Sequence, residues 1–234
     1  MDQAKIWEYF QNHDEAGGSF DHAIPRYKFL ARQVPVGCHA LNVGVGRGGL
    51  ESILTKNGVV VSCLDPSESS IERVRHELGF GDRAQVGRSE IMPFAESQFD
   101  VVIMSEVLEH LTSDTLNATL AEVRRVLRPG GRFIGTVPAN EVLQDNRVMC
   151  PHCGEQFHRW GHVQSFSLER MREILTNSHF AIQRNETRAF PSWQRTGVGN
   201  LAKSVVRYVL GRAGASIAQP SIFFEARRSS ANEN

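Results

Sequence analysis

The sequence has few cysteines, no excess of charge of either sign and no long hydrophobic run. Its 26 basic and 26 acidic residues balance, which argues against a chain built to bind DNA or another polyanion. No apolar run is long enough to span a bilayer, and residues 1–5 do not begin a secretory signal peptide. Internal repeats and low-complexity segments are also absent. We therefore expect a globular protein located in the cytoplasm.

The four cysteines include one closely spaced pair, Cys150 and Cys153. So few cysteines favour a reducing compartment and a metal over a disulfide framework. His158 and His162 follow the pair in the pattern C-x2-C-x4-H-x3-H, and two thiolates with two imidazoles form a soft, tetrahedral ligand set suited to zinc. An exposed thiol pair and a redox-active pair are the alternatives, although no thioredoxin-like strand precedes the cysteines.

Apolar segments with strand and helix periodicity alternate through most of the 234 residues, a length that suits one α/β domain with a modest elaboration. Strands are expected at residues 39–44, 59–64, 84–87, 99–104, 132–137, 180–187 and 221–226. Continuous apolar strands separated by helices predict a doubly wound α/β fold, with a mostly parallel sheet covered by helices on both faces.

Three further segments complete the predicted organisation. Residues 1–38 carry two expected helices, at 3–12 and from Pro25 to about residue 33, which would form a helical cover over the binding site. Residues 39–228 form the main domain, and residues 229–234 are expected to be a disordered tail. Between 188 and 228, seven basic residues accompany the single acid Glu225, with a helix near 200–211. A solvated helix is the first interpretation, and a basic rim that meets an anionic acceptor or a membrane surface is the second.

The most informative motif is a glycine turn at residues 44–48. Gly44, Gly46 and Gly48 stand between a predicted strand and a predicted helix, where the backbone can curl tightly and the helix start offers unpaired N–H groups. Asp65 follows 21 residues after Gly44, at the end of the next strand, where an acid can hold ribose hydroxyls. These residues fit a nicotinamide dinucleotide or S-adenosylmethionine, and a turn without a ligand remains a third interpretation.

Later motifs favour S-adenosylmethionine, because their order resembles that of class I S-adenosylmethionine-dependent methyltransferases acting on small molecules, quinones, lipids and sugars. The matching segments are residues 44–48, 64–67, 87–94, 99–111, 126–131 and 161–167. The resemblance covers about residues 40–187. It implies a Rossmann-like, seven-stranded sheet whose last strand is antiparallel, and S-adenosylmethionine as the cofactor.

The resemblance also implies which residues hold the cofactor. They are Asn42, Gly44, Gly46 and Gly48 at the methionine and ribose part, Asp65 at both ribose hydroxyls, Ser89 and Glu90 at the adenine, and Ser105 and Glu106 at the sulfonium. Two positions depart from the family pattern. Asn42 stands where the family usually has an acid, and Arg88 stands where an acid often contacts the adenine. Glu106 is a candidate to supply the missing charge.

Methyl transfer is an in-line displacement that needs positioning and exclusion of water, and an oxygen nucleophile also needs a base. Glu106 and His162 are the predicted catalytic residues, and Glu109 and His110 are weaker candidates for the base. In related methyltransferases a histidine at the position of His162 often faces the acceptor. His162 could therefore be the base while His152 completes the zinc shell.

A closed four-ligand zinc site would be structural and would pin residues 139–165 as a lid beside the carboxyl ends of the strands. The expected acceptor is a small molecule, a lipid or a glycan, with an oxygen or nitrogen nucleophile. The neutral net charge and the lack of a separate RNA-binding module disfavour an RNA methyltransferase. A cofactor-binding or partner-binding protein without catalysis is the remaining alternative.

Overall fold

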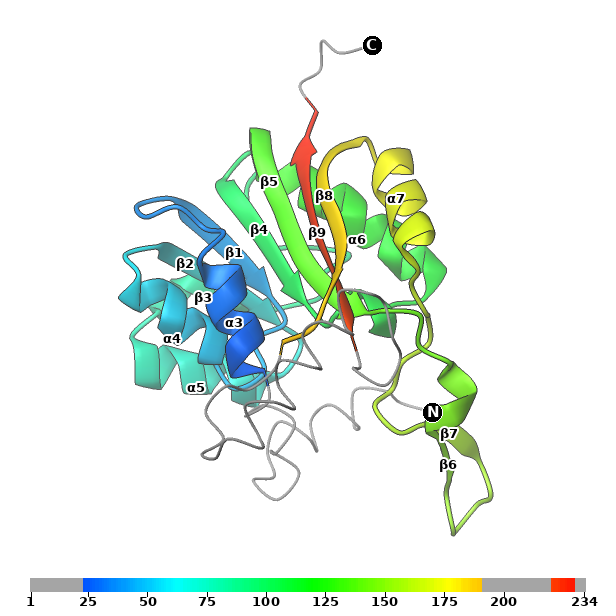
Figure 1. Cartoon of the computed structure of the whole chain (residues 1–234). Coiled ribbons are helices and arrows are strands. Elements are labelled where there is room, and N and C mark those ends of the chain that lie inside the picture. Colours follow the sequence, from blue (N-terminus) through cyan, green and yellow to red (C-terminus); the bar gives the residue numbers. More distant parts are fainter. Residues whose placement is uncertain (1–22, 191–219, 230–234) are drawn as a thin grey trace, which may run out of the picture.

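The computed structural model describes residues 23–190 and 220–229 (Figure 1). The helices expected at 3–12 and near 200–211, and the tail from residue 230, lie outside the described residues. The main elements are α3 (Ile24–Ala31), β1 (His39–Val43), α4 (Gly49–Lys56), β2 (Val60–Asp65), α5 (Glu68–Leu78), β3 (Ala84–Val86), β4 (Phe99–Ser105), η3 (Leu108–His110), α6 (Ser113–Val126), β5 (Leu127–Pro138), β6 (Arg147–Met149), β7 (Gln156–His158), α7 (Leu168–Asn177), β8 (Phe180–Arg188) and β9 (Ser221–Arg228).

Seven of the strands form one sheet in the order β3-β2-β1-β4-β5-β9-β8. The pairs from β3 to β5 are parallel, whereas β9 runs antiparallel to both of its neighbours, β5 and β8. This confirms the predicted mostly parallel sheet with its last strand antiparallel. The strand order changes direction between β1 and β4, and in such sheets ligands bind beyond the carboxyl ends at that point.

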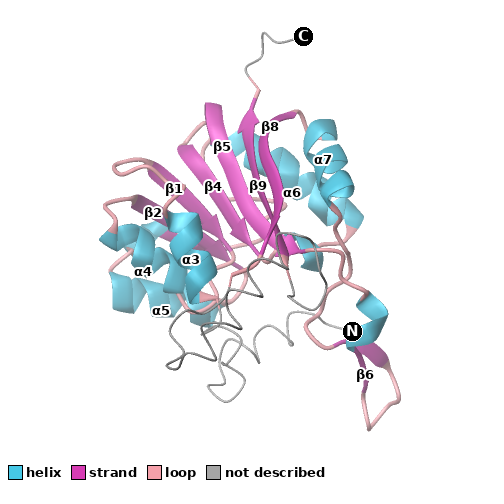
Figure 2. Ribbon diagram, viewed as in Figure 1, coloured by secondary structure: helices cyan, strands magenta, loops and turns pink. Residues whose placement is uncertain are grey.

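Helices cover both faces of the sheet (Figure 2). Along β4, Val101 and Ile103 belong to one buried cluster and Val102 and Met104 to the other, because successive side chains of a strand point to opposite faces. The first cluster packs against α3, α4 and α5, and the second against α6 and α7. Two apolar layers therefore hold the carboxyl ends of the central strands in fixed positions.

The structure differs from the prediction at residues 128–131. We expected the Pro129-Gly130-Gly131 sequence to separate α6 from a strand beginning at Arg132. Instead β5 begins at Leu127, which pairs with Phe99, and the register then shifts so that Arg132 pairs with Val101. Residues 128–131, of which 128–130 are exposed, lie between these two pairs and form an irregularity inside the strand. The predicted N-cap of α7 is confirmed, since the Ser167 side chain accepts a hydrogen bond from the Arg170 N–H.

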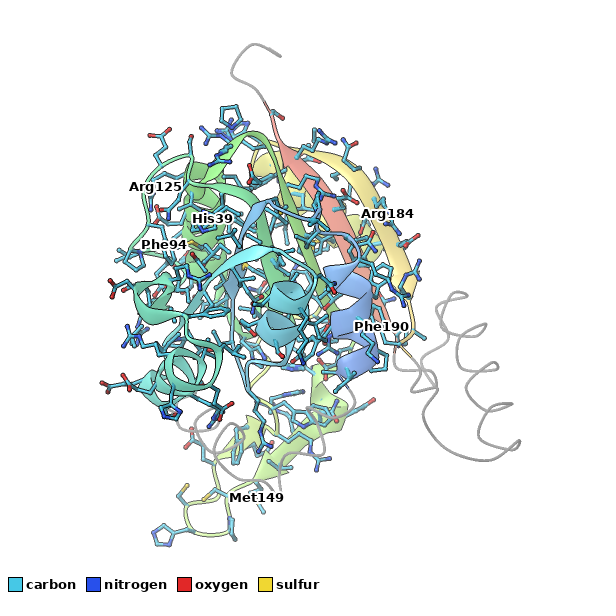
Figure 3. All side chains as sticks on the ribbon, turned by 90° about the vertical axis from the view of Figure 1, so that its left-hand side faces the viewer. His39, Phe94, Arg125, Met149, Arg184 and Phe190 are labelled. Atoms are coloured by element: carbon cyan, nitrogen blue, oxygen red, sulfur yellow. The ribbon has the colours of Figure 1, made fainter. Side chains whose placement is uncertain are left out.

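The insertion after β5 contains an antiparallel hairpin of β6 and β7. The hairpin projects from the body of the domain (Figure 1), and Met149 lies near its far end (Figure 3). Met149 is 63% exposed, and the role of residues 139–165 as a lid stays a prediction. In the described part of the chain, no helix combines the length and the apolar character needed to cross a bilayer.

Candidate active site

The glycine turn directly follows β1 and leads into α4. Gly44 has a φ of 90° and Gly48, the N-cap of α4, has a φ of 77°, a region that residues with a Cβ rarely adopt. A Cβ on Gly44 would stand 2.6 Å from the Val107 side chain, which comes from the loop after β4. The turn therefore needs glycine both for its backbone angles and for the close approach of the β4 loop.

Asp65, the last residue of β2, fixes the shape of this turn. Its Oδ2 accepts a hydrogen bond from the Val45 N–H at 2.7 Å, and its Oδ1 accepts one from the Ser67 N–H at 2.8 Å. Burial raises the pKa of the Asp65 carboxyl, while these backbone N–H groups act in the opposite direction. Each carboxylate oxygen can accept a further hydrogen bond, so a contact with ribose hydroxyls stays a prediction.

Behind the turn, Asn42 pairs with a buried acid that the sequence analysis missed. The Asn42 amide donates hydrogen bonds to Glu51 Oε1 at 2.6 Å and to the Gly44 carbonyl at 3.1 Å. Glu51 lies on α4 and is fully buried, which raises the pKa of its carboxyl to about 7. Its Oε2 has no hydrogen-bond partner among the described residues. An acid on the otherwise apolar inner face of α4 was the available signal.

Ser105 and Glu106 stand at the carboxyl end of β4, beside the turn. Ser105 Oγ accepts a hydrogen bond from Arg26 Nε of α3 at 3.0 Å, so α3 contacts the carboxyl end of β4. The helical cover of residues 1–38 stays a prediction. Glu106 has a φ of 57°, a strained conformation for a residue with a side chain, and its N–H donates to the Thr136 carbonyl at 2.8 Å. Within the described chain its buried Oε1 has no hydrogen-bond partner.

The residues expected beside the adenine lie in the loop after β3. Ser89 is buried, and its hydroxyl lies 2.8 Å from the Thr119 hydroxyl of α6. The hydroxyl therefore holds the loop to α6, and a contact of Ser89 or Glu90 with the adenine stays a prediction. Arg88, one of the two departures from the family pattern, lies 3.8 Å from the carboxylate of Glu90.

The short helix η3 meets the segment that leads into α7. The N–H groups of Val163 and Gln164 both donate to the Glu109 carbonyl, at 2.9 and 3.1 Å. His110 Nδ1 lies 3.3 Å from the Gly161 carbonyl, and the ring centres of His110 and His162 are 4.7 Å apart. Burial, followed by the charge of His162, lowers the pKa of His110 to about 3. Burial raises the pKa of the Glu109 carboxyl, and the nearby Glu106 adds to this effect.

Glu141, a second residue that the sequence analysis missed, joins two of the predicted metal ligands. Its Oε2 lies 2.5 Å from His162 Nδ1, and its Oε1 lies 3.3 Å from His158 Nε2. Burial tends to raise the pKa of Glu141, but the hydrogen bond and charge of His162 outweigh it and hold this pKa below its usual value. Its place three residues beyond β5, at the edge where ligands bind, was the available signal.

Cys150 and Cys153 lie at the turn of the hairpin. The N–H groups of Cys153 and His152 donate to the Cys150 sulfur and lower the pKa of its thiol. His158 pairs with Arg147 at the other end of the hairpin, three residues before Cys150, which is about 10 Å along the strand.

The structure therefore does not bring the four predicted zinc ligands together. Among the residues that the structure describes, the close groups of three candidate ligands are Glu109, His110 and His162, and Glu141, His158 and His162. Neither group contains a cysteine. The spacing predicted a local site, but the paired strands of the hairpin hold its two ends apart.

Two arginines of the predicted basic rim, Arg188 and Arg228, are engaged with other groups, whereas Arg227 is exposed. Arg188 lies 2.9 Å from the Glu186 carboxylate. The Arg228 guanidinium donates to the Leu127 carbonyl and lies 3.6 Å from Glu96. The Arg188 guanidinium also lies 4.3 Å from the ring centre of Phe29 in α3, so both arginines connect their strands to neighbouring segments. The membrane and anionic-acceptor interpretation of the rim stays a prediction.

The structure is a doubly wound α/β domain with a glycine turn at the β1–β4 switch point. Comparison with known proteins shows which family this domain resembles. Residues 41–135 match the family model described as a methyltransferase domain. The chain is 34% identical over 147 residues to a sterol 24-C-methyltransferase of Gibberella zeae, covering 56% of this chain and 38% of the relative. It is 29% identical over 120 residues to the ubiquinone biosynthesis O-methyltransferase of Coxiella burnetii, covering 49% of this chain and 50% of the relative.

A solved structure has the same fold along nearly the whole chain. It is the 1,6-didemethyltoxoflavin-N1-methyltransferase of Burkholderia thailandensis, with bound 1,6-didemethyltoxoflavin and S-adenosylhomocysteine. Its TM-score is 0.65 at 19% identity, over 97% of this chain and 89% of that chain. The chain spans half or less of the length of the two curated relatives. Residues 41–135 therefore resemble a methyltransferase domain, and these two curated relatives are themselves methyltransferases.

Proposed function

We propose that this protein binds S-adenosylmethionine at the 44–48 turn and transfers its methyl group to a small-molecule acceptor. The observation that carries the proposal is the turn itself, which Asp65 ties to the end of β2 and Val107 approaches from the β4 loop. It lies inside the segment that matches the methyltransferase domain family. The sterol and ubiquinone relatives support a small acceptor, with lipids and glycans as narrower possibilities.

When bound, the cofactor supplies an electrophilic methyl group on a cationic sulfur. The protein holds the nucleophile in line with that group and keeps water out. Asp65 would orient the ribose, while Ser105 and Glu106 would face the sulfonium and the acceptor. Arg26 fixes Ser105 from α3, so the helical cover closes one side of the site. The ring of His162, which Glu141 orients, suits either a base or a metal ligand.

Glu51 would supply the negative charge that β1 lacks. The methionine end of the cofactor carries an ammonium group, and a buried carboxylate with an unused oxygen beside the turn is a suitable partner for it. Asn42 would position this carboxylate through their 2.6 Å hydrogen bond. The departure at Asn42 would then move the acid from β1 to α4 without removing it from the site.

Replacing Asp65 by alanine is expected to weaken the binding of S-adenosylhomocysteine by about 10- to 100-fold. A hydrogen bond to a charged group contributes roughly 1.5–3 kcal/mol, and the turn also loses its anchor. Isothermal titration calorimetry measures the affinity. Asp82→Ala, at an exposed position, is the control and should bind as the wild type does. A wild-type protein that binds no S-adenosylhomocysteine would contradict the proposed function, and unchanged binding by Asp65→Ala would contradict the role of Asp65.

Replacing Glu51 by glutamine is expected to weaken S-adenosylhomocysteine binding by about tenfold and to leave methylthioadenosine binding unchanged. Methylthioadenosine lacks the amino-acid end, so it makes no contact with the charge of Glu51. Adding Asn42→Asp to Glu51→Gln returns a carboxylate to β1 and should restore part of the lost affinity. Equal weakening of both ligands would show that Glu51 only maintains the turn.

A further inference from the structure

We propose that Glu109, His110 and His162 form a binding site for one divalent transition-metal ion of the zinc class. One nitrogen or oxygen atom from each residue lies within 4.8 Å of the others. Two of the residues come from η3 and the third from the segment before α7, and the backbone hydrogen bonds between these segments hold them together. The site is separate from the cysteine pair and does not depend on the proposed methyl transfer.

The hydrogen bonds of the two histidines select the nitrogen that can bind a metal. The Gly161 carbonyl can only accept, so His110 Nδ1 carries a proton and the lone pair of the neutral ring is on Nε2. The Glu141 carboxylate likewise accepts from His162 Nδ1, which places the second lone pair on His162 Nε2. Histidine ligands of metals are commonly oriented in this way by a carbonyl or a carboxylate on the other nitrogen.

Glu109 supplies the anionic ligand. Its side chain is 1% exposed, and neither carboxylate oxygen has a hydrogen-bond partner among the described residues. A buried polar group without a partner costs free energy, whereas a cation at this position would satisfy both charge and lone pairs. The candidate ligand atom of Glu109 belongs to the same 4.8 Å group as the two imidazoles.

The neighbouring group of Glu141, His158 and His162 is the weaker candidate. His158 Nδ1 accepts the N–H groups of His162 at 3.1 Å and Trp160 at 3.4 Å, so the proton of its neutral ring is on Nε2. Because Nε2 carries this proton, it has no lone pair for a metal; it lies 3.3 Å from Glu141 Oε1. We infer that Glu141 and His158 support His162 from outside the metal site.

The composition of the site indicates the kind of ion. Two imidazoles and one carboxylate suit Zn²⁺ and related first-row ions better than Mg²⁺ or Ca²⁺, which prefer oxygen ligands. Three protein ligands also leave a position for water or for an oxygen atom of a small molecule, as in catalytic zinc sites. His162 would then be a ligand, and its predicted role as a free base would not apply.

Cobalt substitution distinguishes this site from the one predicted at the cysteines. The 234-residue chain is freed of metal with a chelator and titrated with Zn²⁺ and Co²⁺, and the metal content is measured by mass spectrometry. We expect one ion per chain and a Co²⁺ spectrum without the intense near-ultraviolet thiolate charge-transfer band. The Cys150→Ser/Cys153→Ser variant should bind the ion as the wild type does. Thiolate bands, loss of binding in that variant, or no binding by the wild type would each overturn the proposal.

Variants of the ligands complete the test. Glu109→Gln and His162→Gln should each lose the ion, while His76→Gln, on the surface helix α5, should keep it. Glu141→Gln should weaken binding by about 10- to 100-fold, because it removes the carboxylate that orients His162. Circular dichroism without metal verifies that each variant is folded. Wild-type affinity in folded Glu109→Gln or His162→Gln would contradict the assignment of that residue.

Discussion

Replacing Glu51 by glutamine is expected to raise the free energy of unfolding by about 3 kcal/mol at pH 8 and by much less at pH 5. Burial raises the pKa of this carboxyl from its usual 4.5 to about 7 in the folded protein. Each unit of difference between the folded and unfolded pKa values lowers the free energy of unfolding at high pH by about 1.4 kcal/mol. Glutamine has the shape of the protonated acid and can accept the hydrogen bond from Asn42, so it removes the penalty of the buried charge.

The direction in which stability changes with pH follows from proton binding in the folded and unfolded states. Below pH 4.5 both the folded and the unfolded states hold the proton, and Glu51 adds no pH dependence. Between pH 4.5 and 7 the unfolded state loses its proton first, so the free energy of unfolding falls as the pH rises. Above pH 7 both states are ionised and the penalty is constant. Burial is complete at this position, so solvent does not screen the effect.

Urea unfolding at pH 5 and pH 8 measures this difference. Glu72→Gln is the matched control, because its side chain is 65% exposed on α5 and exposed pairs contribute at most about 1 kcal/mol. The control should change stability little at either pH. If Glu51→Gln stabilises the protein equally at pH 5 and pH 8, the Glu51 carboxyl does not titrate as described.

The same substitution is expected to strengthen the fold and to weaken cofactor binding. A buried carboxylate that lowers stability near neutral pH is easier to understand if a bound cation compensates its charge. Stability and ligand affinity commonly oppose each other at such positions. Measuring the free energy of unfolding and the S-adenosylhomocysteine affinity of Glu51→Gln therefore shows whether the Glu51 carboxylate serves ligand binding or only lowers stability.

The fold could be predicted because its signals are local. Strand and helix periodicities, the glycine turn and the Ser167 cap each depend on residues close together in the sequence. The structure has those that fall within residues 23–190 and 220–229. The irregular start of β5 was missed because Pro129 and the two glycines normally end an element, while here pairing with β4 keeps the strand continuous across them.

The site was only partly predictable, since its remaining contacts join distant segments. Asp65, Ser105 and Glu106 follow strands whose carboxyl ends meet, so their proximity to the turn could be inferred from topology. Residues 139–165 fold back onto η3. This brings His162 within 2.5 Å of Glu141 and close to Glu109 and His110. Sequence spacing instead favoured ligands close along the chain, which the hairpin holds apart.

Replacing Gly44 by alanine is expected to lower the free energy of unfolding by about 3 kcal/mol and to abolish measurable S-adenosylhomocysteine binding. The backbone angle of this residue costs a side chain roughly 1–2 kcal/mol, and crowding in a packed interior adds about 1–3 kcal/mol. The new Cβ would stand 2.6 Å from Val107. The β4 loop would have to move away from the turn, which disturbs the place where the cofactor would lie.

The Gly37→Ala variant separates backbone strain from crowding by Val107 as causes of the lost stability. Gly37 has a similar φ of 79°, but no atom of the described residues lies within 4 Å of the position that a Cβ would occupy there. Alanine at this position should therefore cost only the backbone strain and should leave ligand binding intact. Urea unfolding and calorimetry on both variants give the comparison. Adding Val107→Ala to Gly44→Ala removes the crowding methyl groups and should recover part of the lost stability. Equal losses for the Gly44 and Gly37 variants would show that backbone strain alone, and not the approach of the β4 loop, makes glycine necessary in the turn.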